Sequence, residues 1–102
     1  MTHNKKIIGT ATKPRASVFR SNKNIDVQFI DDIKGTTILS LTSKKIDQKL
    51  KPVDGAFETG KALAKLAIAK KITEIVYDRN GYRYHGQVKA MAEGLREGGL
   101  KF

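Results

Sequence analysis

The residues best suited to chemistry cluster in one short stretch, Asp78 to Gly86, which reads DRNGYRYHG. It holds two arginines, two tyrosines, a histidine and two glycines. Arginine binds phosphate through parallel hydrogen bonds and stacks on nucleobases, as tyrosine does, while glycine lets a sugar-phosphate backbone come close. On a loop, this combination favours binding to RNA with exposed, irregular features.

Each of these side chains also has a purely structural interpretation. One tyrosine could pack beneath the loop, and Arg79 could pair with Asp78 or with another acid. His85 could cap a following helix or bind a backbone carbonyl. The stretch therefore needs support from the rest of the chain before it indicates a function.

Catalysis is the first alternative function, because His85 and Asp78 could act as acid and base. The chain has only two histidines, however, and its acidic residues fall on separate turns or faces instead of converging on a metal pair. It contains no cysteine, no Walker-type phosphate loop and no dinucleotide fingerprint. We therefore expect no catalytic residues, no metal, no cofactor and no small-molecule substrate.

The charge of the chain supports a polyanionic partner. Its 102 residues carry a formal net charge of +10, and the isoelectric point is about 10.0. Such a charge opposes compaction unless a polyanion neutralises it, and nucleic acid is the commonest one, ahead of an anionic membrane surface. Residues 1–24 hold six lysines and arginines and no acid, which indicates either a solvated basic tail or an arm that binds polyphosphate.

The chain shows no feature of a membrane or secreted protein. No apolar run reaches the roughly 18 residues of a transmembrane helix. The start, MTHNKKIIGT, has no apolar core of signal-peptide length. We expect the protein to work in the compartment where it is made, without a membrane partner.

Three short runs in the first half of the chain predict strands. Residues 16–20 are rich in strand-forming side chains, residues 25–30 alternate with Ile25, Val27 and Phe29 on one face, and residues 36–41 follow a turn at Gly35. Polar residues 21–24 and the segment 31–35 form tight turns between them. This arrangement predicts an antiparallel meander.

The second half of the chain has helical spacing on both sides of one further strand. Residues 56–71 form a helix after a lysine-rich loop, with Asp54 as a candidate N-cap. Its apolar stripe consists of Ala56, Gly60, Leu63, Ala64, Ala67 and Ile68. Residues 73–77 form a fourth strand, and residues 86–99 a second helix with Val88, Met91, Ala92 and Leu95 in the core.

The order β-β-β-α-β-α predicts an α/β fold, a four-stranded mixed sheet with two helices covering at least one face. The stretch 78–86 then lies between the fourth strand and the second helix. Ligands of open α/β sheets bind at such carboxyl ends of strands, and helix N-termini offer free N–H groups to phosphate.

Two segments of the sequence resemble a known family. KPRASVFRSNKNI, residues 13–25, and DRNGYRYHGQVKAMAEGLREGGLKF, residues 78–102, are similar to the bacterial-type large-subunit ribosomal protein eighteen family, which binds 5S rRNA. The resemblance extends over nearly the whole chain from Gly9 onward. It implies a structural, non-catalytic protein with a ribonuclease H-like arrangement.

The resemblance also implies partners and a location. These are 5S rRNA, 23S rRNA and neighbouring 5S-binding ribosomal proteins in the central protuberance of the large subunit. The ribosome would be that of a bacterial cytoplasm or of an organelle stroma or matrix. The rival hypothesis is a general nucleic-acid chaperone or compacting protein, which would not prefer 5S rRNA over a random RNA.

The expected RNA-binding residues come from both segments, and Asp78 also matches the family motif. The first segment supplies Lys13, Arg15, Arg20, Ser21, Asn22, Lys23 and Asn24. The second supplies Arg79, Asn80, Gly81, Tyr82, Arg83, Tyr84, His85, Gly86 and Lys89.

Domain boundaries and departures from the family complete these expectations. Residues 1–13 are expected to be a short, flexible basic arm, and residues 14–102 a single globular 5S rRNA-binding domain.

The sequence departs from the family pattern at several places. Typical members begin with a longer arginine-rich arm. Asn80 replaces a glycine, although asparagine also tolerates left-handed backbone angles. Gln87 replaces a common arginine, which removes one phosphate contact.

Overall fold

A computed structural model describes residues 7–102 of the chain. Its elements are β1 (Arg15–Arg20), β2 (Ile25–Asp31), β3 (Thr36–Thr42), a short 3₁₀ helix η1 (Ser43–Lys45), α1 (Pro52–Ala69), β4 (Val76–Asp78) and α2 (Gly86–Glu97). The predicted order β-β-β-α-β-α is therefore confirmed, and it is consistent with a ribonuclease H-like arrangement.

The sheet is mixed, with the strand order β3-β2-β1-β4. β1 pairs antiparallel with β2, which pairs antiparallel with β3, so the predicted meander is confirmed. β4 pairs in parallel with β1, through the register Arg15–Val76, Ala16–Tyr77 and Ser17–Asp78. Helix α1 makes the crossover that such a parallel connection needs.

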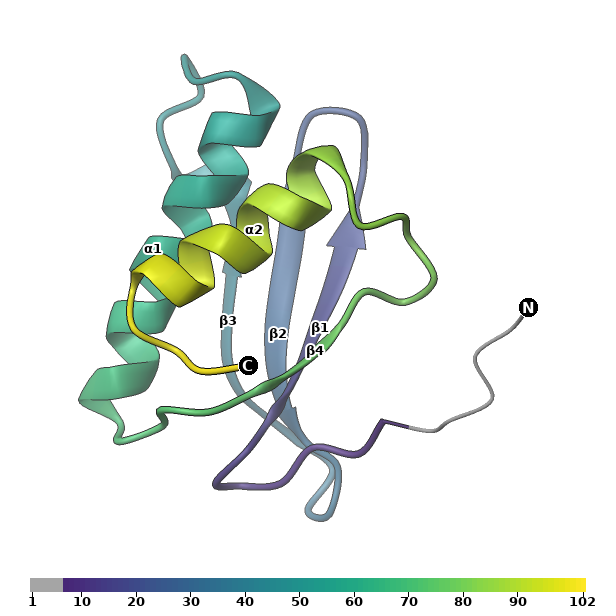
Figure 1. Ribbon diagram of the computed structural model, residues 1–102, viewed down its shortest axis with the longest axis vertical. Helices are drawn as coiled ribbons and strands as arrows, with labels where there is room; N and C mark the ends of the chain where they lie inside the picture. Colours follow the sequence, from purple (N-terminus) through teal and green to yellow (C-terminus); the bar gives the residue numbers. More distant parts are fainter. Residues whose placement is uncertain (1–6) are drawn as a thin grey trace.

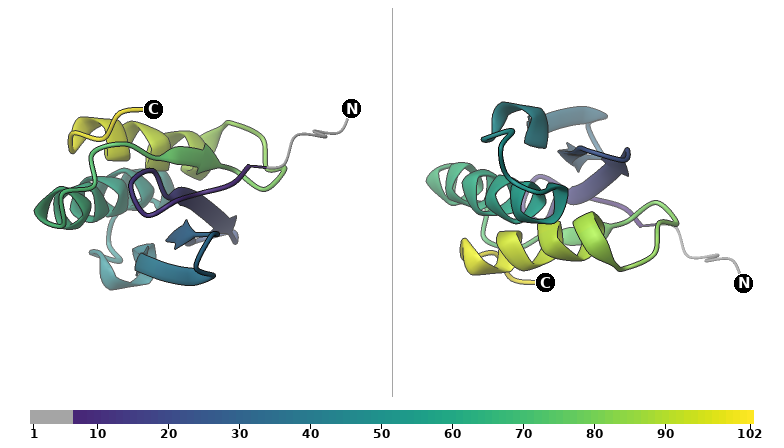
Figure 2. Two further views of the ribbon diagram at one scale, coloured as in Figure 1. Left: turned by 90° about the horizontal axis from the view of Figure 1, so that it is seen from below. Right: turned by 90° about the horizontal axis from the view of Figure 1, so that it is seen from above.

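Both helices lie together on one face of the sheet (Figures 1 and 2). The alternation of β2 explains this arrangement, because Ile25, Val27 and Phe29 are fully buried under the helices while Gln28 is exposed. Each such side chain contributes about 1.5–3 kcal/mol when it leaves water. We call the opposite, helix-free side of the sheet the open face.

The two helices approach each other closely where both carry glycine. A Cβ on Gly94 of α2 would overlap the carbonyl oxygen of Phe57 in α1, and a Cβ on Gly60 would lie 2.5 Å from the carbonyl oxygen of Met91. The predicted core residues of α2 are all buried. Small residues at the crossing therefore allow two helices to cover a narrow sheet.

Three local predictions need correction. Asp54 is not the N-cap of α1, because the helix begins at Pro52 with Lys51 as its N-cap, and proline's fixed φ suits the first helical position. Ile68 does not belong to the buried stripe, since it is 40% exposed near the helix end. The fourth strand begins at Val76 instead of residue 73, because Ile75 hydrogen-bonds to the chain that follows α2.

Of the predicted arm, residues 1–13, residues 1–6 lie outside the described residues. Gly9 is buried, its N–H donates to an Asp32 carboxylate oxygen over 2.7 Å, and its carbonyl accepts from the Asp32 N–H. The chain is thus hydrogen-bonded to the domain from Gly9 onward, and the boundary at residue 13 stays a prediction.

The glycine contact between the helices gives a stability prediction. Replacing Gly94→Ala should lower the free energy of unfolding by about 1–3 kcal/mol, because the Cβ would meet backbone that cannot move aside. The matched control is Gly55→Ala in α1, where a Cβ meets nothing within 4 Å. That change should raise stability by up to about 1 kcal/mol through helix propensity. Urea unfolding of both variants measures the difference, and equal effects would contradict the packing argument.

Candidate nucleic-acid interface

Two segments far apart in the sequence meet at one edge of the sheet. β1 and β4 are parallel neighbours, so their carboxyl ends, Arg20 and Asp78, point the same way. The turn 21–24 that follows β1 and the loop 79–85 that follows β4 therefore lie at the same end of the molecule (Figure 1). We call these two segments, together with Arg20 at the end of β1, the loop edge. The two segments that were expected to supply the RNA-binding residues therefore converge.

Asn80 fastens loop 79–85 to β1. Its φ of +49° is left-handed, as expected for asparagine in place of glycine, and Gly81 follows with a φ of +82°. The Asn80 side-chain amide donates to the Ser17 hydroxyl over 2.8 Å and to the Val18 carbonyl over 2.7 Å. Asn80 therefore has a structural role within the predicted site, because its side chain hydrogen-bonds loop 79–85 to β1.

Tyr82 makes the second connection between the loop and β1. Its ring meets Phe19 edge-on, with the centroids 6.3 Å apart at 75°. The Arg20 guanidinium lies over the same ring at 5.5 Å, and the Tyr82 hydroxyl donates to the Arg20 carbonyl over 3.4 Å. Tyr82 is half-buried by these contacts, so it is the tyrosine that packs under the loop.

Gln87 makes the third connection, from the first turn of α2 to the turn after β1. It is buried, and its side-chain amide donates to the carbonyls of Ser21 and Asn22 over 2.8 and 3.3 Å. The sequence comparison with the family had suggested only a lost phosphate contact at this position. Its bracing role depends on contacts with residues 65 and 66 positions away, which no local pattern reveals.

Arg15 is held within the protein by two acids. Its guanidinium donates to both carboxylate oxygens of Asp32, at 2.9 and 3.0 Å, and to Asp78 at 2.9 Å. The hydrogen bonds to Asp32 raise the pKa of Arg15 further above its ordinary value, against the opposing effect of burial, so the group stays charged. Asp78 thus pairs with Arg15 and not with Arg79, whose guanidinium donates to the Tyr82 carbonyl.

The remaining cations of the loop edge are exposed. Within the described part of the chain, Arg83 and Lys23 make no ion pair. The Arg20 guanidinium lies over the Tyr82 ring and that of Arg79 donates to the Tyr82 carbonyl, and neither arginine forms an ion pair with an acid among residues 7–102. The loop edge therefore presents uncompensated positive charge, which suits phosphate. The exposed members of the predicted set are Lys13, Arg20, Ser21, Asn22, Lys23, Arg79, Asn80, Gly81, Arg83, Tyr84, His85 and Lys89.

Tyr84 and His85 lie on the outer side of the loop. Tyr84 is 43% exposed, and Arg96 of α2 donates to its hydroxyl over 3.2 Å. His85 occupies the N-cap position of α2 but its side chain makes no capping bond. Gly86 begins the helix with a φ of +55°. Tyr84 and His85 can therefore present flat rings to a ligand.

Asn24 closes the turn after β1 against η1. Its side-chain oxygen accepts from the Ser43 hydroxyl over 3.0 Å, and that hydroxyl accepts from the Ile25 N–H over 2.9 Å. The Ser21 N–H also donates to the Asn24 carbonyl over 2.8 Å. The turn is thus rigid, with Asn22 and Lys23 exposed at its tip.

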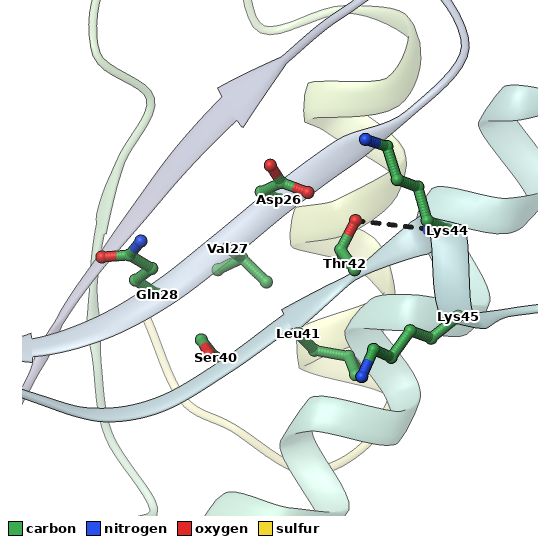
Figure 3. A pocket seen from close by; sticks show the side chains of 8 residues that line it. All are labelled: Asp26, Val27, Gln28, Ser40, Leu41, Thr42, Lys44 and Lys45. Carbon is green, nitrogen blue, oxygen red and sulfur yellow. Dashed lines mark hydrogen bonds between the residues drawn. The ribbon is translucent and has the colours of Figure 1, made fainter.

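A shallow hollow of about 330 Å³ lies beside β2 and β3 (Figure 3). The residues that line it are Asp26, Val27, Gln28, Ser40, Leu41, Thr42, Lys44 and Lys45. One carboxylate and two ammonium groups give it mixed charge and hydrogen-bonding character. Val27 and Leu41 add apolar surface, so the lining is mixed.

Residues 7–102 contain neither a candidate metal site nor a candidate membrane-spanning helix. No three histidine, aspartate or glutamate side chains among them lie close enough together to hold a metal ion. No helix in that range has both the length and the apolar character needed to cross a membrane.

Comparisons with known proteins show similarity to a family of ribosomal proteins. A family model described as "Ribosomal L18 of archaea, bacteria, mitoch. and chloroplast" matches residues 2–102. The "Large ribosomal subunit protein uL18" of Mesoplasma florum is 52% identical to this chain over 97 residues, covering 95% of this chain and 84% of the relative.

Two further relatives carry the same description. That of Mycoplasma mycoides subsp. mycoides is 50% identical over 98 residues, covering 95% of this chain and 84% of the relative. That of Lawsonia intracellularis is 50% identical over 102 residues, covering 96% and 85%. The similarity thus extends along nearly the whole chain, beyond the two segments that first suggested it.

The two hydrogen bonds from the Asn80 side chain to β1 give a stability prediction. Asn80→Gly keeps the left-handed backbone but removes both bonds to β1, so it should lower the free energy of unfolding by about 1–2 kcal/mol. Hydrogen exchange at the Tyr82 amide should also accelerate, because the loop would open more often. Asn22→Gly, at an exposed position of the facing turn, is the control. If both variants behave alike, the Asn80 side chain does not fasten the loop.

Proposed function

The chain belongs to the L18 family of ribosomal proteins, and from that premise we propose that it binds 5S rRNA and helps to attach it to 23S rRNA in the central protuberance. Its family makes it a structural constituent of the large ribosomal subunit and not an enzyme. The finer assignment, to 5S rRNA and to the loop edge, is our proposal.

One observation carries the proposal: the basic turn after β1 and the basic loop after β4 form one continuous loop edge. Three side chains of the protein hold the two segments together, namely Asn80, Tyr82 and Gln87. A surface that is rigid before binding loses little conformational entropy when it binds. It therefore suits a folded RNA that is recognised by shape.

The charged groups have distinct tasks in this proposal. Arg20, Lys23 and Arg83 neutralise phosphates, which gives affinity and fixes the orientation of the RNA. Tyr84 and His85 provide flat surfaces for unpaired bases, and Gly81 gives the backbone room to approach. Arg15 organises the strands below, because its charge is already matched by Asp32 and Asp78.

Attachment to a second RNA requires a basic surface outside the loop edge. Lys65 of α1 and Lys70, directly after that helix, are exposed. In the part of the chain that the structure describes, neither lysine pairs with an acid. In Figure 1, α1 lies on the side of the molecule opposite loop 79–85. These lysines therefore suit 23S rRNA while the loop edge holds 5S rRNA.

The test is a binding measurement with 5S rRNA made by transcription. Arg83→Glu should weaken binding roughly ten- to a hundredfold and reduce the slope of log affinity against log salt by about one or more, because a phosphate contact is lost. The double variant Arg79→Glu/Arg83→Glu should abolish binding. Circular dichroism and thermal unfolding check that each variant is folded.

The matched control reverses two charges away from the loop edge. Lys65→Glu/Lys70→Glu changes the net charge as much as the double arginine variant does, yet it should leave 5S rRNA affinity within a fewfold of the original. An excess of random RNA of equal length should not displace 5S rRNA. Displacement by that competitor, or equal losses in both double variants, would instead indicate a general nucleic-acid chaperone.

A further inference from the structure

Phe19 is a large aromatic side chain on the open face of the sheet. In β1, Ala16 and Val18 are fully buried under the helices, and Phe19 points the other way with 66% of its surface exposed. A single exposed apolar residue is ordinary. What distinguishes Phe19 is the set of groups that surrounds it.

The Phe19 ring is fixed from one side by Tyr82. The two rings meet edge to face at 6.3 Å, and Tyr82 is itself held by Arg20 through its ring and its hydroxyl. An aromatic ring whose position is set by its neighbours loses little freedom when another ring stacks on it. Phe19 is therefore a preformed platform.

Phe19 also continues the loop edge onto the sheet. Arg20 follows it directly in the chain, and Tyr82 joins it to loop 79–85. In the neighbouring strand, its register partner is Asp26, which in turn faces Thr42 of β3. This row of residues leads across the open face to the hollow beside Lys44 (Figure 3).

We propose that Phe19 is a nucleotide-binding residue that stacks on an unpaired base of the RNA, an inference that rests on the proposed binding of 5S rRNA. The carboxylate of Asp26, one strand away at about 5 Å between Cα atoms, repels phosphate and accepts hydrogen bonds from base amino groups. The nucleobase, and not the backbone, therefore lies over Phe19. Its phosphate is directed toward Arg20.

The alternative occupant of Phe19 is an apolar pocket of a neighbouring protein. RNA fits the surroundings better, because the platform adjoins uncompensated arginines and stacking tolerates every base. A stacking role requires a flat ring at this position, whereas an apolar pocket accepts any bulky aliphatic side chain. This difference sets the design of the test.

The experiment compares Phe19→Leu, which keeps an apolar side chain, with Phe19→Trp, which keeps a stacking ring. Phe19→Leu should weaken 5S rRNA binding roughly 5- to 150-fold, the usual effect of losing one base–aromatic stack, with an unchanged salt slope. Phe19→Trp should bind 5S rRNA about as tightly as the original protein does. Ile33→Ala, which alters a 74% exposed side chain in the β2–β3 turn, is the control and should bind normally.

Chemical probing of the bound RNA gives the second readout. One unpaired nucleotide should be protected by the original protein and by Phe19→Trp, and become reactive with Phe19→Leu. If Phe19→Leu binds with the original affinity and footprint, the stacking role is overturned while the proposed function stands. If the unaltered protein shows no preference for 5S rRNA and Arg83→Glu has no effect on binding, both the proposed function and the stacking role of Phe19 are overturned.

Discussion

The parallel pairing of β4 with β1 is the constraint on which the rest of this structure depends. Only three residue pairs form it, yet it places the ends of two strands, distant in sequence, at one edge. Arg15 reinforces the pairing, because its guanidinium bridges Asp32 beyond β2 and Asp78 at the end of β4. Removing one partner of such a network leaves charged groups unmatched, which is costly when they are partly buried.

The cations in and next to β1 and in loop 79–85 therefore include two kinds. Arg15 serves the fold, since three hydrogen bonds to carboxylates use its guanidinium. Arg20, Arg83 and Lys23 have no such acid partners among the described residues and remain open to a polyanion. A sequence motif alone does not distinguish the two kinds, because it shows that a residue is arginine but not whether an acid pairs with it in the fold.

The small residues of the helices explain why one face of the sheet remains open. Gly60 and Gly94 let α1 and α2 approach until backbone meets backbone, so both helices cover the same face. Tyr77 contributes to this layer by donating to the Val88 carbonyl over 2.7 Å, and burial raises the pKa of its hydroxyl above the ordinary value. The opposite face keeps Phe19, Asp26 and Gln28 outside the core.

Much of the architecture follows from the sequence by itself. The alternation of Ile25, Val27 and Phe29 determined a half-buried strand, and the spacing of Val88, Met91 and Leu95 determined the inner side of α2. Both patterns are local, because side-chain direction repeats every 2 or 3.6 residues. The charge of +10 and the composition of residues 78–86 likewise determined which chemistry the surface offers.

Only the tertiary structure decided which of those residues hold the protein together. Arg15 and Asp78 are 63 positions apart, and Asn80 and Val18 are 62 apart. Gln87, Tyr82 and Phe19 acquire their roles in the same way, through contacts made once β4 lies beside β1. Periodicity carries no information about such pairs, since it describes neighbours along one element and not which elements become neighbours in space.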